Sequence, residues 1–310
     1  MKLSRHRLLI GIAAAVLLTC AAFGISALVS APSVRLLHTE PSDFAPILVF
    51  EEYGQRCMNF NTIEDDGRHT CMSLENPDEM VFNYTRMMTS ALFVNPSPRN
   101  VLVVGLGGAT LPKALEKILP NAVIDSVEID PAVVRVAERF FGYRPGPRQR
   151  VFVEDGRAFV ERAVQAHRHY DMVMLDAFDV DYIPAHLLTR EFLTLVRDLL
   201  SPDGVLAANS FTTSHMYDRE SATYAAVFGD FFNLRAEHRF ITANRVIIAT
   251  RADLPDDQTL ARHAAALTDT LAPFGIDAAR QLQWYARDRD WDENVQILVD
   301  ELSPFSEKTD

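Results

Sequence analysis

The stretch from Val101 to Asp130 reads VLVVGLGGATLPKALEKILPNAVIDSVEID and decides the fold of this chain. It predicts a strand over Val101–Gly105 that is apolar on both faces, as in a buried parallel sheet. A helix over Leu111–Leu119 and a second strand over Ala122–Ile129 complete a βαβ unit. Three glycines end the first strand and let the backbone turn sharply against a ligand. These glycines are Gly105, Gly107 and Gly108.

The second strand ends in acidic residues, Glu128 and Asp130. In open α/β sheets, ligands bind outside the carboxyl ends of the strands, and an acid about 20 residues beyond the glycines commonly holds ribose hydroxyls. The two oxygens of a carboxylate can accept hydrogen bonds from two adjacent hydroxyls. We therefore expect a nucleoside site in which the three glycines lie against the ligand and Glu128 binds the ribose. The alternative is an ordinary βαβ unit with a tight turn.

The third strand also ends in residues suited to a nucleoside. Val151–Arg157 reads VFVEDGR, which places Asp155 and Gly156 at the strand end. Asp155 can accept a hydrogen bond from an exocyclic amine such as that of adenine, and Gly156 permits close approach. The alternative for Asp155 is an N-cap of the next helix, a role for which aspartate is well suited.

The fourth strand leads into a cluster of carboxylates. Residues 170–184 read YDMVMLDAFDVDYIP, so Asp176 follows an apolar strand, with Asp179 and Asp181 in the loop beyond. Clustered carboxylates repel one another unless a cation balances them, and a protonated amine would do so. The segment lacks a nearby histidine and the spacing of a metal site, so we expect no metal. A solvated acidic loop is the alternative.

The remaining elements alternate along the chain, which indicates a mostly parallel sheet covered by helices on both faces. Further strands are expected at Val151–Glu154, Tyr170–Leu175, Gly204–Ser210, Leu234–Phe240 and Asn244–Thr250. Helices are expected at Glu79–Phe93, Ala132–Phe141, Arg157–Gln165, Leu188–Leu200, Ser221–Phe232 and Leu260–Leu271. Before this sheet, Ile47–Glu51, Cys57–Ile63 and His69–Leu74 predict a small antiparallel β-subdomain, preceded by a polar linker at residues 32–43.

The amino terminus carries a long uncharged run, Leu8–Val29, preceded by Lys2, Arg5 and Arg7. A run of roughly 20 apolar residues spans a bilayer as a helix, and a basic flank stays in the cytoplasm. We therefore expect a single-pass anchor in the inner membrane with the rest of the chain in the periplasm. A cleaved signal peptide is the alternative. The net charge of -12 argues against nucleic acid as a partner.

Two of the three cysteines flank a turn signal. Cys57 and Cys71 lie on either side of Asp65-Asp66-Gly67, so a hairpin would bring them opposite each other. In an oxidising compartment they could form a disulfide, whereas two buried free thiols are the alternative. The resulting domain plan is an anchor or signal at residues 1–31, a linker, β-subdomain and helix at residues 32–98, and a catalytic domain at residues 99–310.

Four segments, VLVVGLGGATLPKAL, VEIDPAVVRVAERFF, VEDGRAFV and YDMVMLDAFD, resemble in order and spacing the polyamine aminopropyltransferases, the spermidine synthase family. The resemblance covers about residues 45–250 and is strongest to the bacterial spermidine synthase-like branch. It implies a class I methyltransferase-like, Rossmann-like sheet. The implied reaction moves the aminopropyl group of decarboxylated S-adenosylmethionine to a small amine such as putrescine.

The resemblance also implies roles for individual residues. Glu128 would hold the ribose, and Asp155 with Gly156 would hold the adenine side. Asp176 would be the catalytic base, and Asp179 would bind the amine, with Asp181 beside it. The resemblance is compatible with a homodimer.

Departures from the family pattern keep other functions open. The glycine loop lacks the aspartate found in spermidine synthases, and Ala45 stands where a glutamine is expected. The family segment D-E-x-x-Y-H-E reads DEMVFNY, so Phe82, Asn83 and Tyr84 replace its Tyr, His and Glu. One alternative is therefore a methyltransferase that uses S-adenosylmethionine. The other is a non-enzymatic module that binds nucleosides or polyamines.

Overall fold

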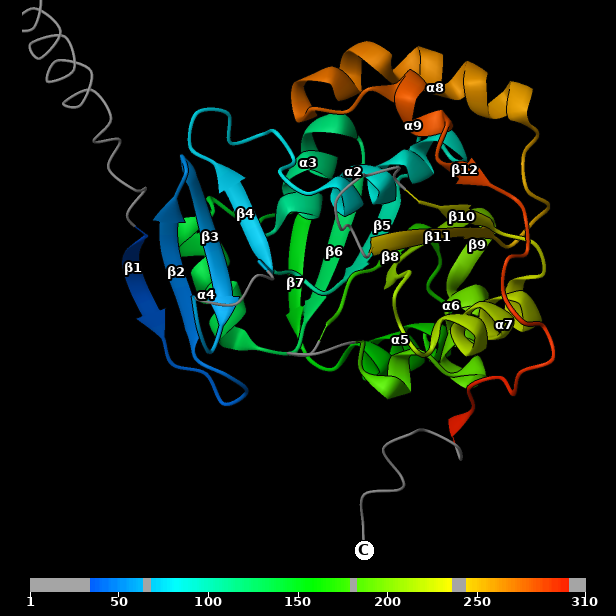
Figure 1. The fold of residues 1–310 in the computed structure, drawn as a ribbon, viewed down its shortest axis with the longest axis horizontal. Helices are drawn as coiled ribbons and strands as arrows, with labels where there is room; N and C mark the ends of the chain where they lie inside the picture. The colour runs from blue at the N-terminus through cyan, green and yellow to red at the C-terminus, as the bar shows by residue number, and fades with distance from the viewer. Residues whose placement is uncertain (1–33, 64–67, 179–182, 236–243, 301–310) are drawn as a thin grey trace, which may run out of the picture. The chain divides into compact units, whose positions relative to one another are not determined.

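Two β-sheets organise the part of the chain that the computed structural model describes, residues 34–63, 68–178, 183–235 and 244–300. The larger sheet has eight strands in the order β12-β10-β11-β9-β8-β5-β6-β7 (Figure 1). Their bounds are β5 Asn100–Val104, β6 Val123–Glu128, β7 Gln149–Val153, β8 Tyr170–Leu175, β9 Leu200–Phe211, β10 Phe232–Leu234, β11 Asn244–Thr250 and β12 Tyr285–Ala286.

The order of the parallel strands creates a ligand-binding crevice. Strand β5 pairs in parallel with β6 on one side and with β8 on the other. The chain then continues outward to β7 beyond β6 and to β9 beyond β8. The strand order therefore reverses between β5 and β8. Open α/β sheets form a crevice at the carboxyl ends of the strands at such a point and bind ligands there. Beyond β9, the strands β11, β10 and β12 are antiparallel.

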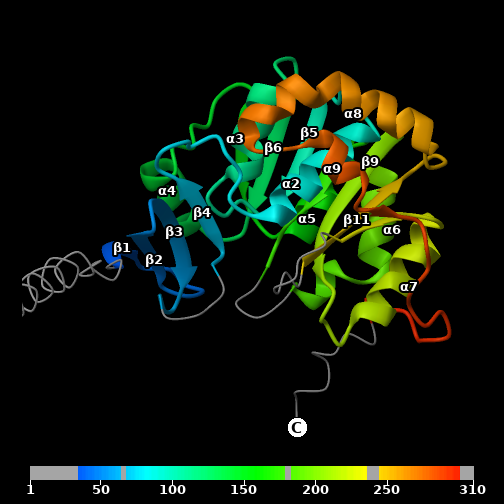
Figure 2. The ribbon, with the colours of Figure 1, turned by 45° about the horizontal axis from the view of Figure 1, so that its top comes forward.

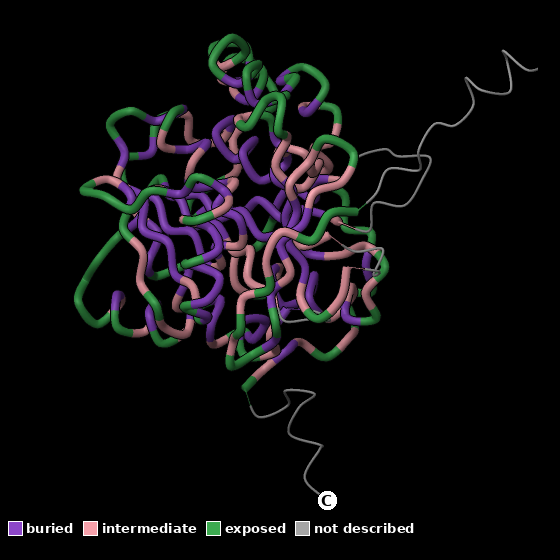
Figure 3. Tube along the Cα trace, turned by 90° about the vertical axis from the view of Figure 1, so that its left-hand side faces the viewer, coloured by how far each residue is buried: buried purple, intermediate pink, exposed green. Residues whose placement is uncertain are grey.

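Helices cover both faces of this sheet, as expected. Alternate residues of β5 separate between the faces: Val101 and Val103 pack in one cluster, and Leu102 and Val104 in the other. Figures 1 and 2 show the two helical layers, and Figure 3 shows the buried segments, in purple, in the interior of the molecule. The first layer contains α2 Asn83–Thr89, α3 Thr110–Ile118, α8 Asp257–Leu271 and α9 Ala278–Leu282, and the second contains α5 Gly156–Gln165, α6 Arg190–Leu199 and α7 Tyr217–Phe228.

The smaller sheet is antiparallel, in the order β1-β2-β3-β4. Its strands are β1 Arg35–Glu40, β2 Ile47–Glu52, β3 Gln55–Phe60 and β4 Thr70–Ser73. Helix α4, Pro131–Phe140, packs against this sheet through a shared core that includes Val49, Met58 and Val133. The helix begins after Asp130, whose side chain accepts from the Ala132 N–H, with proline at its first position.

The structure corrects three predicted elements. The helix expected over Glu79–Phe93 begins at Asn83, because Met80 instead pairs with Met72 as a β-bridge, and a 3-10 turn follows over Ser90–Phe93. The expected polar linker at residues 32–43 contains β1. The helix expected over Ser221–Phe232 begins earlier, at Tyr217. It also ends earlier, at Phe228, because Gly229 at φ 77° terminates α7.

Some predictions fall outside the described residues. These are the anchor over Leu8–Val29, the turn signal at Asp65-Asp66-Gly67, Asp179 and Asp181, and residues 236–240 of the strand expected over Leu234–Phe240. Within the described ranges, no helix has both the length and the apolar character needed to cross a bilayer.

Candidate functional site

A cavity of about 300 Å³ opens at the carboxyl ends of β5, β6 and β8. Its volume is at the lower end of the range for small-molecule sites. The smaller sheet closes it from the other side with Met58, Phe60 and Thr70. Six of the residues predicted from the sequence line this cavity: Gly105, Gly107, Glu128, Asp155, Gly156 and Asp176.

Two of the glycines allow close backbone packing at the cavity. Gly105 has a φ of +95°, and a Cβ there would lie 2.3 Å from the carbonyl oxygen of Asp176. A Cβ at Gly156 would lie 2.6 Å from Val104 Cγ1. Because real Cβ atoms do not approach other atoms so closely, side chains at these positions would displace the carboxyl ends of the strands. The glycines thus let β5, β8 and the start of α5 meet around one crevice.

Gly108 differs from the prediction. It is absent from the cavity lining, and its N–H donates to Thr70 Oγ1 at 3.1 Å. A Cβ at Gly108 would lie 2.2 Å from Thr70 Cγ2. The physical reason for a glycine here is close packing against β4, not contact with the ligand.

Glu128 is held in place by the backbone around it. Its Oε2 accepts from the Leu106 N–H and its Oε1 from the Asp130 N–H, each at 3.0 Å. Burial raises the pKa of Glu128, although these hydrogen bonds partly oppose the rise. Each carboxylate oxygen keeps a second lone pair for a ligand hydroxyl. Glu128 therefore also supports the fold, since its carboxylate pairs two backbone N–H groups.

Asp155 is the N-cap of α5, and it also lies at the cavity. Its Oδ1 caps α5 by accepting from the Ala158 N–H at 2.9 Å, and it lines the cavity. Its Oδ2 lies 2.9 Å from His186 Nε2. Partial burial alone would raise the pKa of Asp155, but the hydrogen bonds from Ala158 and His186 outweigh it and hold the pKa below its usual range. Asp155 is therefore an ionised acceptor at neutral pH.

Asp176 lies directly after β8, at the wall of the cavity. Its Oδ1 accepts from Asn209 Nδ2 at 2.9 Å, and the Tyr84 hydroxyl hydrogen-bonds to the same carboxyl group. Burial raises the pKa of Asp176 to about 7, while these two hydrogen bonds oppose the rise. Burial and the neighbouring Asp176 charge raise the pKa of Tyr84 well above its usual value, so the phenol stays protonated and donates. A carboxylate poised in this way can exchange a proton near neutral pH.

Sequence reasoning missed Asn209 and His186 and gave Tyr84 no role of its own. Asn209 lies near the end of a predicted strand, which is a signal that could have placed it at the sheet edge. Tyr84 was noted only as a departure from the family segment. No sequence pattern marked His186 as a site residue, because its contact with Asp155 is a tertiary contact between segments that are distant in the sequence. None of the described residues forms a cluster of three or more His, Cys, Asp or Glu side chains suited to a metal.

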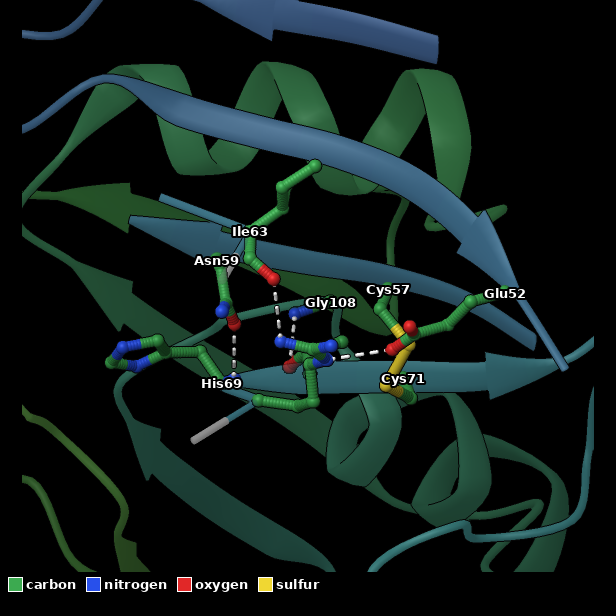
Figure 4. The surroundings of a disulfide bond; sticks show 9 residues. Glu52, Cys57, Asn59, Ile63, His69, Cys71 and Gly108 are labelled. Atoms are coloured by element: carbon green, nitrogen blue, oxygen red, sulfur yellow. Dashed lines mark hydrogen bonds and ion pairs between the residues drawn. A yellow bond between two sulfur atoms is a disulfide. The ribbon is translucent and has the colours of Figure 1, made fainter. Parts of the chain in front are cut away.

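Cys57 and Cys71 form a disulfide, which decides between the two alternatives left open for them. They face each other in the register of β3 and β4. Figure 4 shows the disulfide between the two strands. Both cysteines are buried together with Phe50, and the partly exposed Phe82 packs against them.

Comparison with known proteins identifies the family. Residues 81–237 match the model of the spermine/spermidine synthase domain. The chain is 40% identical to a polyamine aminopropyltransferase of Vibrio vulnificus over 270 residues, which cover 87% of this chain and 90% of that protein.

Two solved structures share the fold. A probable spermidine synthase from Corynebacterium glutamicum is 18% identical, with a TM-score of 0.63 over 84% of this chain and 99% of that one. Human methyltransferase-like protein 13 in complex with SAH is 26% identical, with a TM-score of 0.56 over 69% of this chain and 96% of that one. The family match and the 40% identity across most of both chains together show that this chain belongs to the spermine/spermidine synthase family, the polyamine aminopropyltransferases.

Proposed function

We propose that this protein is an aminopropyltransferase that moves the aminopropyl group of decarboxylated S-adenosylmethionine to a small amine, with putrescine the first candidate. The observation that carries the proposal is the Asp176 carboxylate, whose pKa is about 7, at the wall of a cavity lined by a glycine loop and Glu128. The membership of the family supports the same reaction.

The donor fits the nucleoside half of the cavity. Glu128 accepts from the ribose hydroxyls through the free lone pairs of its two oxygens, and Gly105 and Gly107 leave room for the ligand. Asp155 lies at the third strand end, on the side proposed for adenine. Its two oxygens already bond Ala158 and His186, so adenine would share an oxygen with one of these donors.

In the proposed reaction, the amine nitrogen attacks the carbon next to the sulfonium. The new N–C bond forms as the C–S bond breaks. The electron pair of the C–S bond stays on sulfur, which leaves as a neutral thioether, so the leaving group needs no general acid. The proton released by the amine passes to Asp176, which is partly ionised near neutral pH. Asn209 and Tyr84 fix the carboxylate, so alignment of the attack is a further contribution.

The amine side of the cavity is largely apolar near Asp176. Tyr84, Ala177 and Phe178 line it together with Pro184. Such walls favour the unprotonated amine that the reaction needs. We propose that Asp179 and Asp181, which lie outside the described residues, bind the distal ammonium group of a diamine.

A transfer assay with product analysis by mass spectrometry tests the proposal. The full chain is incubated with putrescine and either decarboxylated S-adenosylmethionine or S-adenosylmethionine. We expect spermidine and methylthioadenosine with the first donor. Methylated product with the second donor alone would establish the methyltransferase alternative, and binding of methylthioadenosine without any transfer would establish the non-enzymatic one.

We also propose that the catalytic domain lies in the periplasm, held by an amino-terminal anchor. The basic residues before the uncharged Leu8–Val29 run support this orientation. The Cys57–Cys71 disulfide supports it independently, because disulfides persist in oxidising compartments and are rare in the cytosol.

A further inference from the structure

Two glycines of the loop, Gly107 and Gly108, lie against Thr70 of the smaller sheet. The Thr70 hydroxyl oxygen accepts from the Gly108 N–H at 3.1 Å. A Cβ at Gly107 would lie 2.9 Å from the same oxygen, and Gly107 and Thr70 both line the cavity. The glycine loop is thus packed against Thr70 at the edge of the cavity. A shift of Thr70 would move the loop with it.

Thr70 is the first residue of β4, a short strand at the edge of the smaller sheet. Strand β4 contains only Thr70–Ser73, and its partner within that sheet is β3. In this pairing Thr70 faces Met58, and the adjacent pair is Cys57 and Cys71, which the disulfide joins. The covalent link is therefore one residue along β4 from the contact with the glycine loop. Figure 4 shows the disulfide in the same view as Gly108.

Short edge strands are weakly held: among the described residues, β4 pairs along its length with β3 and has a single bridge, between Met72 and Met80, on its other side. This pairing leaves the strand freedom to shift. The disulfide removes that freedom for β4. It lies in a buried cluster with Phe50, so it also fixes the strand relative to the interior of the smaller sheet.

We propose that Thr70 is a positioning residue for the nucleoside site, and that the Cys57–Cys71 disulfide holds Thr70 against the glycine loop. This inference rests on the proposed function for its ligand, but the contact itself does not need a ligand. Donor affinity then depends on a covalent bond outside the cavity. Loss of the disulfide and loss of the Thr70 hydroxyl should both weaken donor binding by disturbing the same contact, the one between Thr70 and the Gly108 N–H.

The test combines substitutions in a double-mutant cycle, with Kd for methylthioadenosine measured by calorimetry on the full chain. Thr70→Val removes the hydroxyl but keeps the shape, and we expect about tenfold weaker binding, the usual size for one hydrogen bond. Thr70→Ser should restore the affinity. Thr268→Val is the matched control, since the Thr268 hydroxyl donates to the Ala264 carbonyl within its own helix, α8. It should leave the affinity unchanged.

Cys57→Ala/Cys71→Ala should also weaken binding, and adding Thr70→Val to it should cost much less than tenfold. Two changes that act on one contact are not additive. Full additivity would overturn the link between the disulfide and Thr70. In steady-state kinetics, Thr70→Val should raise KM for the donor and leave KM for the amine and kcat unchanged. A loss in kcat alone would contradict a positioning role at the donor site.

Hydrogen–deuterium exchange without ligand separates this inference from the proposed function. The peptide that contains Gly107 and Gly108 should exchange faster in Thr70→Val and in the double cysteine variant than in the wild type. If it does so while the wild type binds no methylthioadenosine, the proposed function fails but the support of the loop by Thr70 stands. If exchange is unchanged in both variants, the inference is wrong.

Discussion

Asn209 Nδ2 donates to Asp176 Oδ1 at 2.9 Å, across the ends of two neighbouring parallel strands. The amide is oriented by a second bond, because Asn209 Oδ1 accepts from Asn244 Nδ2 at 3.1 Å on the adjacent antiparallel strand. Three strands thus hold one carboxylate. Together with Tyr84, this chain of amides keeps Asp176 at the cavity wall and opposes the rise in its pKa that burial causes.

Asp176→Asn tests the catalytic role directly. The substitution keeps the size of the side chain but removes its charge and basicity, so we expect turnover to fall by about 10²–10⁴-fold. Affinity for methylthioadenosine should be unchanged, since Glu128 lies on a different strand. Asp198→Asn, an exposed residue of α6, is the control. Full turnover in Asp176→Asn would remove this residue from the mechanism.

Tyr84→Phe should shift the pH dependence of the reaction. The wild type has an Asp176 pKa of about 7, so kcat/KM should rise with pH through that value as the carboxylate ionises. The Tyr84 hydrogen bond favours the ionised form, and its loss should move the rise to higher pH. Activity should therefore fall at pH 7 and recover at pH 9. Tyr53→Phe, on an exposed residue, should leave the profile in place. An unshifted profile in Tyr84→Phe would contradict this role.

Asp179→Asn tests one of the two carboxylates that follow Asp176 in the sequence. If Asp179 binds the distal ammonium group, removing its charge should raise KM for the amine more than it lowers kcat. The kinetic constants for putrescine and for a monoamine of similar length provide the comparison. The monoamine lacks the distal charge, so its KM should not change. An equal effect on both amines would place Asp179 elsewhere.

Glu128→Gln separates ligand binding from support of the backbone. Gln keeps one oxygen acceptor but loses the charge, and we expect nucleoside binding to weaken by about 1.5–3 kcal/mol, as for a hydrogen bond to a charged group. Glu128→Ala should in addition lower the free energy of unfolding, since the N–H groups of Leu106 and Asp130 lose their acceptor. Glu154→Gln, at the end of the next strand, is the control. Unchanged affinity in folded Glu128→Gln would exclude Glu128 from the site.

The orientation of the chain is testable with reporters fused after Asp310. We expect a reporter that is active only in the periplasm to be active. The denatured protein should then show two more thiols after reduction than before, from Cys57 and Cys71. A signal from a reporter that is active only in the cytoplasm would refute the proposed orientation.

The sequence predicted the parts of the site that depend on strand ends. Val101–Gly105 is apolar on both faces, and Tyr170–Leu175 is apolar apart from Asp171, so the strands follow from composition. Gly105 and Asp176 are then placed at their carboxyl ends. The βα units place residues that follow parallel strands at the carboxyl edge of the sheet, independently of tertiary contacts elsewhere in the chain.

Contacts between distant segments could not be predicted in this way. His186 reaches Asp155, and Thr70 reaches Gly108, only through tertiary packing. The start of α2 was missed for the same reason, since Met80 pairs with Met72 across the smaller sheet, and helical periodicity carries no information about that pairing. The role of Gly108 was misassigned because a glycine required by a protein neighbour and one required by a ligand look identical in sequence.

The contact between Gly108 and Thr70 has a consequence for engineering within the family. Any residue larger than glycine at position 108 would place its Cβ 2.2 Å from Thr70 Cγ2, so the loop cannot receive an acidic side chain there while Thr70 is retained. Transplanting a donor-binding loop from a relative would therefore require the matching β4 residue to be transplanted as well. These two segments, distant along the chain, form a single exchangeable unit.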